Sequence, residues 1–214
     1  MDALFQGLPL LARGTVTTLY LSAASVVFAT ALGLILAMLQ LYGGIILRAL
    51  VEVYLYIVRG VPLLVMLFAM YYALPYANVR VEPISGGILV IGVYFAAFMA
   101  EVFRAAVLSV PRGQWEAARA VGLRTPRILL DVVLAQAARV AGPPYINTCI
   151  MVVKGTSLVS IIGLADVTYV GKQIVERTLA PFEIFGAVAL VYFTLCFALS
   201  RLGRYLEKRV NYAY

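Results

Sequence analysis

Long runs of apolar residues dominate the sequence and constrain what it can fold into. The first run, from about Thr17 to Leu41, holds no charged residue, and its polar side chains are Ser, Thr, Tyr and Gln40. About 20 consecutive apolar residues in a helix cross the hydrocarbon core of a bilayer. The run therefore predicts a membrane-spanning helix.

The composition indicates the same class. Of the 214 residues, 64% are hydrophobic and 13% are charged, whereas soluble domains carry about 25% charged residues. The mean hydropathy is +0.97. A chain of this length has room for about four to six spans with short loops. We therefore expect an all-α integral membrane protein whose single transmembrane domain occupies residues 1–214.

The apolar runs predict five spans. The later runs lie at about Ala49–Leu74, Ile88–Val110, Val132–Val153 and Ile184–Leu202. The second run is interrupted by Arg59-Gly60-Val61-Pro62, where glycine and proline loosen a helix. Five spans place Arg48, the segment Pro111–Arg127 and the basic C-terminal tail on one side, which the positive-inside rule makes the cytoplasm. We expect a multi-pass protein with its N-terminus outside and its C-terminus in the cytoplasm.

Several classes of function are excluded or disfavoured. The net charge of +7 does not indicate nucleic acid binding, because the basic residues cluster in loops between spans. The chain has no histidine, which excludes a His-ligated metal site and His-based acid–base chemistry. It has no Gly-x4-Gly-Lys-Ser/Thr loop for nucleotide phosphates. Cys149 and Cys196 lie inside apolar runs and are interpreted as buried small hydrophobes rather than a disulfide.

One polar, arginine-rich segment, about residues 111–127, lies between two apolar runs. It contains Glu116-Ala117-Ala118-Arg119-Ala120-Val121-Gly122. Gly122 suits the position after a helix end, because glycine adopts the left-handed conformation at little cost. Thr125-Pro126 then indicates the N-cap and first turn of a new helix. We expect two short helices with a sharp bend, presented to a soluble partner.

Five blocks in order extend this pattern along the chain. They are Arg59-Gly60-Val61-Pro62-Leu63-Leu64, Ala100-Glu101-Val102-Phe103-Arg104, Ser109 to Ala118, Val133-Leu134-Ala135-Gln136-Ala137 and Lys154-Gly155-Thr156-Ser157-Leu158. Together with the Glu-Ala-Ala-x3-Gly loop, they resemble the polar amino acid permease family of binding-protein-dependent ABC importers, the histidine/glutamine/arginine type. The resemblance covers about residues 14–209.

The resemblance implies a fold, partners and site residues. The fold would be the type I importer permease of five transmembrane helices, with a cytosolic coupling loop between helices 3 and 4. A separate ATPase dimer, which binds ATP and Mg, would receive the coupling helix, and this chain would hold no cofactor of its own. A second copy or a sibling permease would complete the path, and an extracytoplasmic solute-binding protein would deliver the amino acid at the bacterial inner membrane. The coupling residues would be Glu116, Ala117, Ala118, Arg119, Gly122 and Arg124.

Charged residues inside the bilayer are functional hypotheses by default, because their burial is costly. Glu101 and Arg104 lie three apart on one helical face and can pair, so Glu101 is either a structural partner or part of the substrate path. Glu52 and Arg59 lie seven residues apart on one helical face, and we interpret them as structural. The stretch Lys154-Gly155-Thr156-Ser157 predicts a helix break that lines a cavity, and such breaks in transporters can hold the charged groups of a substrate. Packing is the alternative for that stretch.

The chain departs from the family at three positions. Ala135 stands where proline is usual, Val61 replaces threonine, and Gly155 replaces an Asp or Glu. The last change removes a carboxylate that could hold a cationic side chain. We therefore expect a neutral or acidic polar substrate, such as glutamine or glutamate, over arginine.

Two other classes compete with the importer subunit. A self-sufficient small secondary transporter or channel would need no Glu-Ala-Ala loop and would more often show two related halves, which the sequence lacks. A membrane-embedded enzyme would need a catalytic constellation, and the sequence offers no histidine, metal set or facing carboxylate pair. We expect no enzyme activity in this chain.

Overall fold

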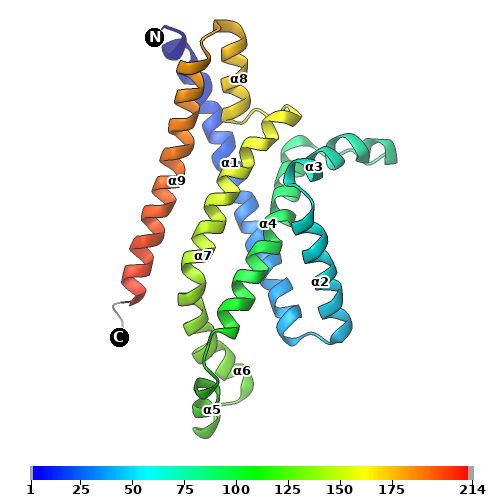
Figure 1. Cartoon of the computed structure of the whole chain (residues 1–214), viewed down its shortest axis with the longest axis vertical. Helices are drawn as coiled ribbons and strands as arrows, with labels where there is room; N and C mark the ends of the chain where they lie inside the picture. The colour runs from blue at the N-terminus through cyan, green and yellow to red at the C-terminus, as the bar shows by residue number, and fades with distance from the viewer. Residues whose placement is uncertain (1, 212–214) are drawn as a thin grey trace.

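The computed structural model describes residues 2–211, and within them every regular element is a helix (Figure 1). Four helical stretches are long and apolar enough to cross a membrane: Gly7–Tyr42, Pro83–Leu108, Thr125–Ile162 and Pro181–Tyr205. The elements are α1 (Asp2–Tyr42), α2 (Ile45–Gly60), α3 (Leu63–Phe68), the π-turn η1 (Ala69–Ala73), the 3-10 turn η2 (Leu74–Ala77), α4 (Pro83–Leu108), α5 (Arg112–Ala120), α6 (Thr125–Arg127), the π-turn η3 (Ile128–Val133), α7 (Leu134–Gly155), the 3-10 turn η4 (Thr156–Ile162), α8 (Val167–Thr178) and α9 (Pro181–Asn211).

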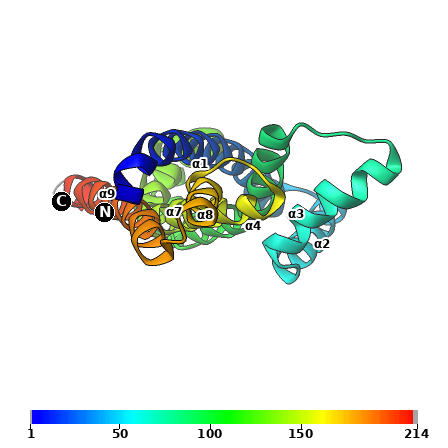
Figure 2. The ribbon, with the colours of Figure 1, turned by 90° about the horizontal axis from the view of Figure 1, so that it is seen from above.

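The second predicted span is not one rod. The chain bends by 99° between α2 and the stretch Leu63–Ala77. α3 still packs on the bundle through the buried Leu63 and Leu67, and the chain after α3 leads away from it (Figures 1 and 2). Val61 is extended at φ −100° and ψ 130°, the conformation that a following proline imposes. The sequence predicts a loosened helix here and underestimates the bend. The expectation of five spans holds when the bent pair counts as one span.

The centre of the bundle is the contact between α1 and α4. A Cβ added to Gly33 on α1 would lie 2.8 Å from Met99 Cβ and 3.1 Å from the Ala100 amide nitrogen. Gly92 on α4 packs in the same way against the ring of Phe28. Glycines let helix backbones approach closely in a membrane, where association depends on van der Waals contact rather than on exclusion of water. This close contact makes α1 and α4 the frame on which the other helices rest.

The buried Asp166 carboxylate and the Val167 amide together tie three helices at one end of the bundle. Asp166 is fully buried and caps α8, because its Oδ1 accepts a hydrogen bond from the Tyr169 amide at 2.9 Å. Its Oδ2 accepts from the Tyr192 hydroxyl of α9 at 3.0 Å. The Val167 amide donates to Thr18 Oγ1 of α1 at 3.1 Å. Buried polar groups are satisfied in this way, and the junction lies at the end opposite α5 and α6 (Figure 1).

The helix that follows the polar loop changes pitch rather than breaking. It passes from η3 through α7 into η4 and ends at Gly163, whose φ is +81°. The break predicted at Lys154 is therefore wrong. Gly155 is present for packing, since a Cβ there would lie 3.0 Å from the Phe95 ring of α4 and 3.3 Å from Leu63 Cδ2 of α3.

Candidate coupling loop and polar cavity

A short capped helix, α5, closes the bundle at the end of α4 and α7. Pro111 precedes it in an extended conformation, and the Gln114 amide donates to the Pro111 carbonyl at 3.0 Å to start the first turn. At the other end, the Gly122 amide donates to the Arg119 carbonyl at 2.9 Å, and the Leu123 amide donates to the Ala118 carbonyl at 3.1 Å. These two bonds form a Schellman motif, with Gly122 at φ +82° in the left-handed region. The predicted role of Gly122 in the bend is confirmed.

The two faces of α5 differ sharply. Ala118 is 5% exposed and belongs to an apolar cluster with residues of α4, η3 and α7. Glu116, Ala117 and Arg119 are exposed. The side chain of Glu116 makes no hydrogen bond or ion pair within the described part of the chain. The outer face therefore presents small and charged side chains, which suits a groove on another protein.

Apolar contacts and one hydrogen bond hold α5 to the long helices. Ile128 and Val133 on η3 are fully buried, in one cluster with Val107 of α4 and with Val110, which follows that helix. The side-chain amide of Gln136 on α7 donates from Nε2 to Gln114 Oε1 at 3.2 Å. α5 is therefore held against η3, the end of α4 and the start of α7.

The second short helix begins one residue earlier than predicted. Arg124 stands at the N-cap, extended and exposed, and Pro126 lies in the first turn. The proline position is confirmed. The predicted cap at Thr125 is wrong by one residue, because Thr125 already adopts helical conformation.

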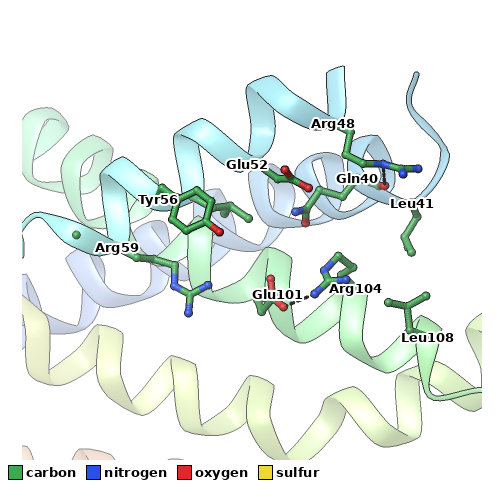
Figure 3. Close-up of a pocket in the computed structure, with 11 residues that line it drawn as sticks. Gln40, Leu41, Arg48, Glu52, Tyr56, Arg59, Glu101, Arg104 and Leu108 are labelled. Carbon is green, nitrogen blue, oxygen red and sulfur yellow. Dashed lines mark hydrogen bonds and ion pairs between the residues drawn. The ribbon is translucent and has the colours of Figure 1, made fainter. Parts of the chain in front are cut away.

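A polar cavity of about 930 Å³ lies between α2 and α4, beside the end of α1 (Figure 3). Its charged lining comes from Arg48, Glu52 and Arg59 on α2 and from Glu101 and Arg104 on α4. The α2 residues follow helical spacing on one face, so the sequence places them together. Charged groups in a membrane bundle normally face such an interior cavity. The sequence did not predict that Glu52 and Arg59 on one helix and Glu101 and Arg104 on another line the same cavity.

Interactions within the cavity are only partly satisfied. Arg104 Nη2 pairs with Glu101 Oε1 at 2.5 Å, which confirms the pairing predicted from the i, i+3 spacing. Arg48 Nε donates to the Gln40 carbonyl at 3.1 Å. Gln40 Oε1 and Arg104 Nε are buried and have no hydrogen-bond partner among the described residues. An unused donor and acceptor beside a polar cavity favour a guest that can form hydrogen bonds.

The cavity continues into a second groove between α4 and α7. Arg59 and Glu101 line both spaces, and the second groove, about 570 Å³, adds Asn147 and Thr148 from α7. Arg59 also lies over the Phe98 ring, 5.8 Å from its centroid. Sequence reasoning missed Gln40 and Asn147, because uncharged polar residues within an apolar run give no signal until the helices are packed.

The predicted substrate stretch is not one open site. Lys154 is exposed, Thr156 is fully buried and Gly155 packs against α3 and α4. The hydroxyls of Thr156 and Ser157 donate at 2.7 Å to the carbonyls of Val153 and Lys154. Lys154 and Ser157 remain accessible, but the structure does not gather all four residues around a common space.

Comparison with known proteins defines the class. Residues 29–212 match the family described as the binding-protein-dependent transport system inner membrane component. The match covers most of the chain, and the chain belongs to this family of membrane permeases.

Individual relatives agree over nearly the whole length. The chain is 36% identical over 204 residues, 95% of this chain and 87% of the relative, to the L-cystine transport system permease protein TcyB of Bacillus subtilis (strain 168). It is 33% identical over 212 residues, 98% of this chain and 97% of the relative, to the glutamine transport system permease protein GlnP of Escherichia coli (strain K12).

Solved structures confirm the predicted fold. The crystal structure of an amino acid ABC transporter with histidines gives a TM-score of 0.90 at 29% identity, with 96% of each chain covered. The inward-facing MetNI methionine ABC transporter gives 0.79 at 22% identity, covering 95% of this chain and 97% of that one, which shows the shared fold alone.

Proposed function

We propose that this chain is the permease subunit of an ATP-driven, binding-protein-dependent importer of polar amino acids. The observation that carries the proposal is the α5 helix, which a Schellman motif caps and which presents Glu116, Ala117 and Arg119 outward from the base of the bundle. Family membership and relatives named for cystine and glutamine support the substrate class.

The partners follow from the same proposal. An ATPase dimer binds ATP and Mg and receives α5 in a surface groove, and a second copy or a sibling permease completes the path. ATP binding closes the ATPase dimer, α5 transmits that movement to α4 and α7, and the path alternates between the two sides of the inner membrane. The N-terminus lies outside with α8, where a solute-binding protein delivers cargo, and the C-terminus lies in the cytoplasm.

Co-purification with the ATPase tests the proposed coupling face. Glu116→Lys reverses a charge on the exposed face of α5 and is expected to lose the ATPase during affinity purification from membranes. Glu176→Lys makes the same change on the exposed surface of α8 and is the matched control. Equal recovery of the ATPase with both variants would contradict the assignment of α5.

We further propose that the joined polar cavities form part of the substrate path. Glu101 and Arg59 line both spaces, and together they offer a carboxylate and a guanidinium to the ammonium and carboxylate of an amino acid. Lys154, three residues beyond Met151 at the end of the second groove, adds attraction for a carboxylate. The exposed Lys154 and the relative named for glutamine transport favour a neutral or acidic side chain, such as that of glutamine or glutamate, over arginine.

Uptake competition in vesicles tests the substrate proposal. Wild type is expected to take up glutamine or glutamate in preference to arginine, and Lys154→Ala is expected to weaken glutamate uptake most. Lys172→Ala, a change of an exposed lysine on α8, should leave uptake unchanged. If arginine is the best substrate and Lys154→Ala has no effect, both the substrate class and the role of Lys154 are wrong.

A further inference from the structure

One row of exposed side chains on α7 has the spacing of a helix-packing face. This row, called here the α7 stripe, consists of Val140, Pro144, Asn147, Met151 and Lys154. Its members lie alternately four and three residues apart, which is the 3.5-residue repeat of helices that pack against each other along their length. Within the described part of the chain, no helix covers the stripe, because all five side chains are exposed.

Lys154 places a charge of the α7 stripe deep within the bilayer. A Cβ added to the next residue, Gly155, would lie 3.0 Å from the Phe95 ring, and Phe95 lies half-way along the membrane-spanning stretch Pro83–Leu108. The Lys154 side chain is exposed and forms no ion pair with a described residue. A charge at this depth is costly in lipid and normally faces other protein or water.

Two uncharged polar groups of the α7 stripe lead to the same conclusion. The Asn147 side chain is exposed and makes no hydrogen bond with a described residue. It lines the second groove together with Glu101, which lies about 10 Å before the end of α4, at 1.5 Å per residue. Pro144 has no amide hydrogen to donate to the Val140 carbonyl, four residues before it. Because lipid satisfies no such group, the stripe faces protein or water.

The outer surfaces of α1 and α9 differ from the α7 stripe. Val27 and Ile35 on α1 and Leu190 and Phe193 on α9 are exposed apolar side chains, which suit contact with lipid. Neither helix contributes a residue to the second groove. The α7 stripe, beside that groove, is therefore the part of the surface that another protein chain covers in the membrane.

A second copy of this chain fits the α7 stripe. Two copies insert in the same orientation, so a two-fold axis along the membrane normal brings equivalent residues to the same depth. An asparagine side chain has one acceptor oxygen and two donor hydrogens, so two facing Asn147 side chains satisfy each other, as polar side chains do between transmembrane helices. One asparagine within a packing face also fixes the register and partner number of paired helices. Val140, Pro144 and Met151 carry no charge and meet their equivalents without repulsion.

We propose that two copies of this chain pair through the α7 stripe, with the Asn147 side chains of the two copies hydrogen-bonded to each other. The inference rests on the proposed function for the presence of a second permease, and it adds which face meets that permease and that the two are identical. Two Lys154 side chains repel each other, so the paired α7 helices separate beyond Met151. The lysines then border the substrate path instead of touching.

Cross-linking between cysteines tests the face. In a background with Cys149 and Cys196 replaced by alanine, membranes that contain the assembled transporter are treated with an oxidant. A disulfide needs Cβ atoms about 3.5–4.5 Å apart. Asn147→Cys and Met151→Cys are each expected to give a cross-linked dimer of the chain. Met151→Cys leaves the asparagine pair in place, so it reports on the face even where Asn147→Cys weakens the contact.

Ile35→Cys on α1 is the matched control for this cross-linking. Ile35 is 56% exposed and lies at a similar depth, because the nearby Gly33 packs on Met99 and Ala100, next to Glu101 of the second groove. It should stay monomeric under the same oxidant. Absence of a cross-linked dimer with both Asn147→Cys and Met151→Cys, or equal cross-linking with Ile35→Cys, overturns the proposed face.

Co-expression of two differently tagged copies tests whether the paired permeases are identical. Purification through one tag is expected to recover the other tag from wild type and from Asn147→Gln, which keeps the amide. Asn147→Asp places two carboxylates opposite each other and should lower this recovery at least about tenfold. Asn78→Asp makes the same change at an exposed residue outside the spans and should be recovered as wild type.

The outcomes separate this proposal from the importer assignment. Recovery of a different permease together with the ATPase, without the second tag, refutes pairing of identical copies and leaves the importer assignment standing. Wild-type recovery with Asn147→Asp refutes the asparagine contact. Recovery of neither the ATPase nor any second permease contradicts the importer assignment itself.

Discussion

The turn at Gly122 allows a quantitative test of coupling, because its conformational requirement can be separated from its contacts. Gly122 has φ +82°, and a Cβ added there would meet no atom within 4 Å. The cost of a side chain at this position is therefore conformational rather than steric. An L-residue other than asparagine or aspartate pays about 1–2 kcal/mol in the left-handed region.

Three substitutions at Gly122 are expected to differ in this conformational cost. Asparagine tolerates the left-handed conformation and should behave nearly as wild type. Alanine should lower the population of the capped loop by a factor of about 5–30, which corresponds to 1–2 kcal/mol. Proline fixes φ near −65° and also removes the hydrogen bond from the Gly122 amide to the Arg119 carbonyl, so it should abolish the cap.

The assay is ATP hydrolysis stimulated by the solute-binding protein in proteoliposomes, with membrane insertion of each variant checked separately. Stimulation is expected to fall in the order glycine, asparagine, alanine, proline. Wild-type stimulation in both Gly122→Ala and Gly122→Pro would show that the capped end of α5 is not needed for coupling. An asparagine variant as impaired as the proline variant would refute the conformational reasoning.

Three further predictions concern topology, stability and the energy source. In a cysteine-free background, an impermeant thiol reagent should label a cysteine at position 80 from outside and one at position 124 only from inside; labelling of position 124 from outside would reverse the orientation. Tyr192→Phe leaves Asp166 Oδ2 without its α9 partner and should lower stability by about 1–3 kcal/mol, measured as a lower thermal midpoint than that of the control Phe193→Leu, which changes an exposed side chain of the same helix. Purified without its partners, the chain should neither bind nor hydrolyse ATP. ATP hydrolysis that co-elutes with this chain, in fractions that contain no other ATPase, would contradict its assignment as a permease subunit.

Local signals in the sequence were sufficient for the bend between α5 and α6. Glycine after a small-residue helix predicts the left-handed turn at Gly122, and Pro126 predicts a new first turn, because both residues restrict backbone conformation by themselves. The spacing of Glu101 and Arg104 predicts their ion pair for the same local reason.

Features that depend on packing between distant segments were not predicted. Gly155 suggested a broken helix, but its real constraint is the Phe95 ring on another helix, which no pattern near Gly155 reveals. The polar cavity needs α2 to lie beside α4, so Glu52 and Glu101 could not be assigned to one space. A proline predicts that α2 ends, but the 99° angle depends on where α3 finds apolar neighbours.

The π-turn η3 (Ile128–Val133) has a consequence for changes in chain length. A π-turn carries one residue more than an α-turn over the same stretch of helix. Deleting one residue within it would restore ordinary α-helical pitch and leave Leu134 to Ile162 facing their present neighbours. The same deletion in the middle of α7 would rotate every later side chain by about 100°, since an α-helix has 3.6 residues per turn, and would turn Asn147 and Met151 away from α4. Within this 38-residue helix, the few positions beside the coupling loop are where a residue can be lost without changing the register of the rest.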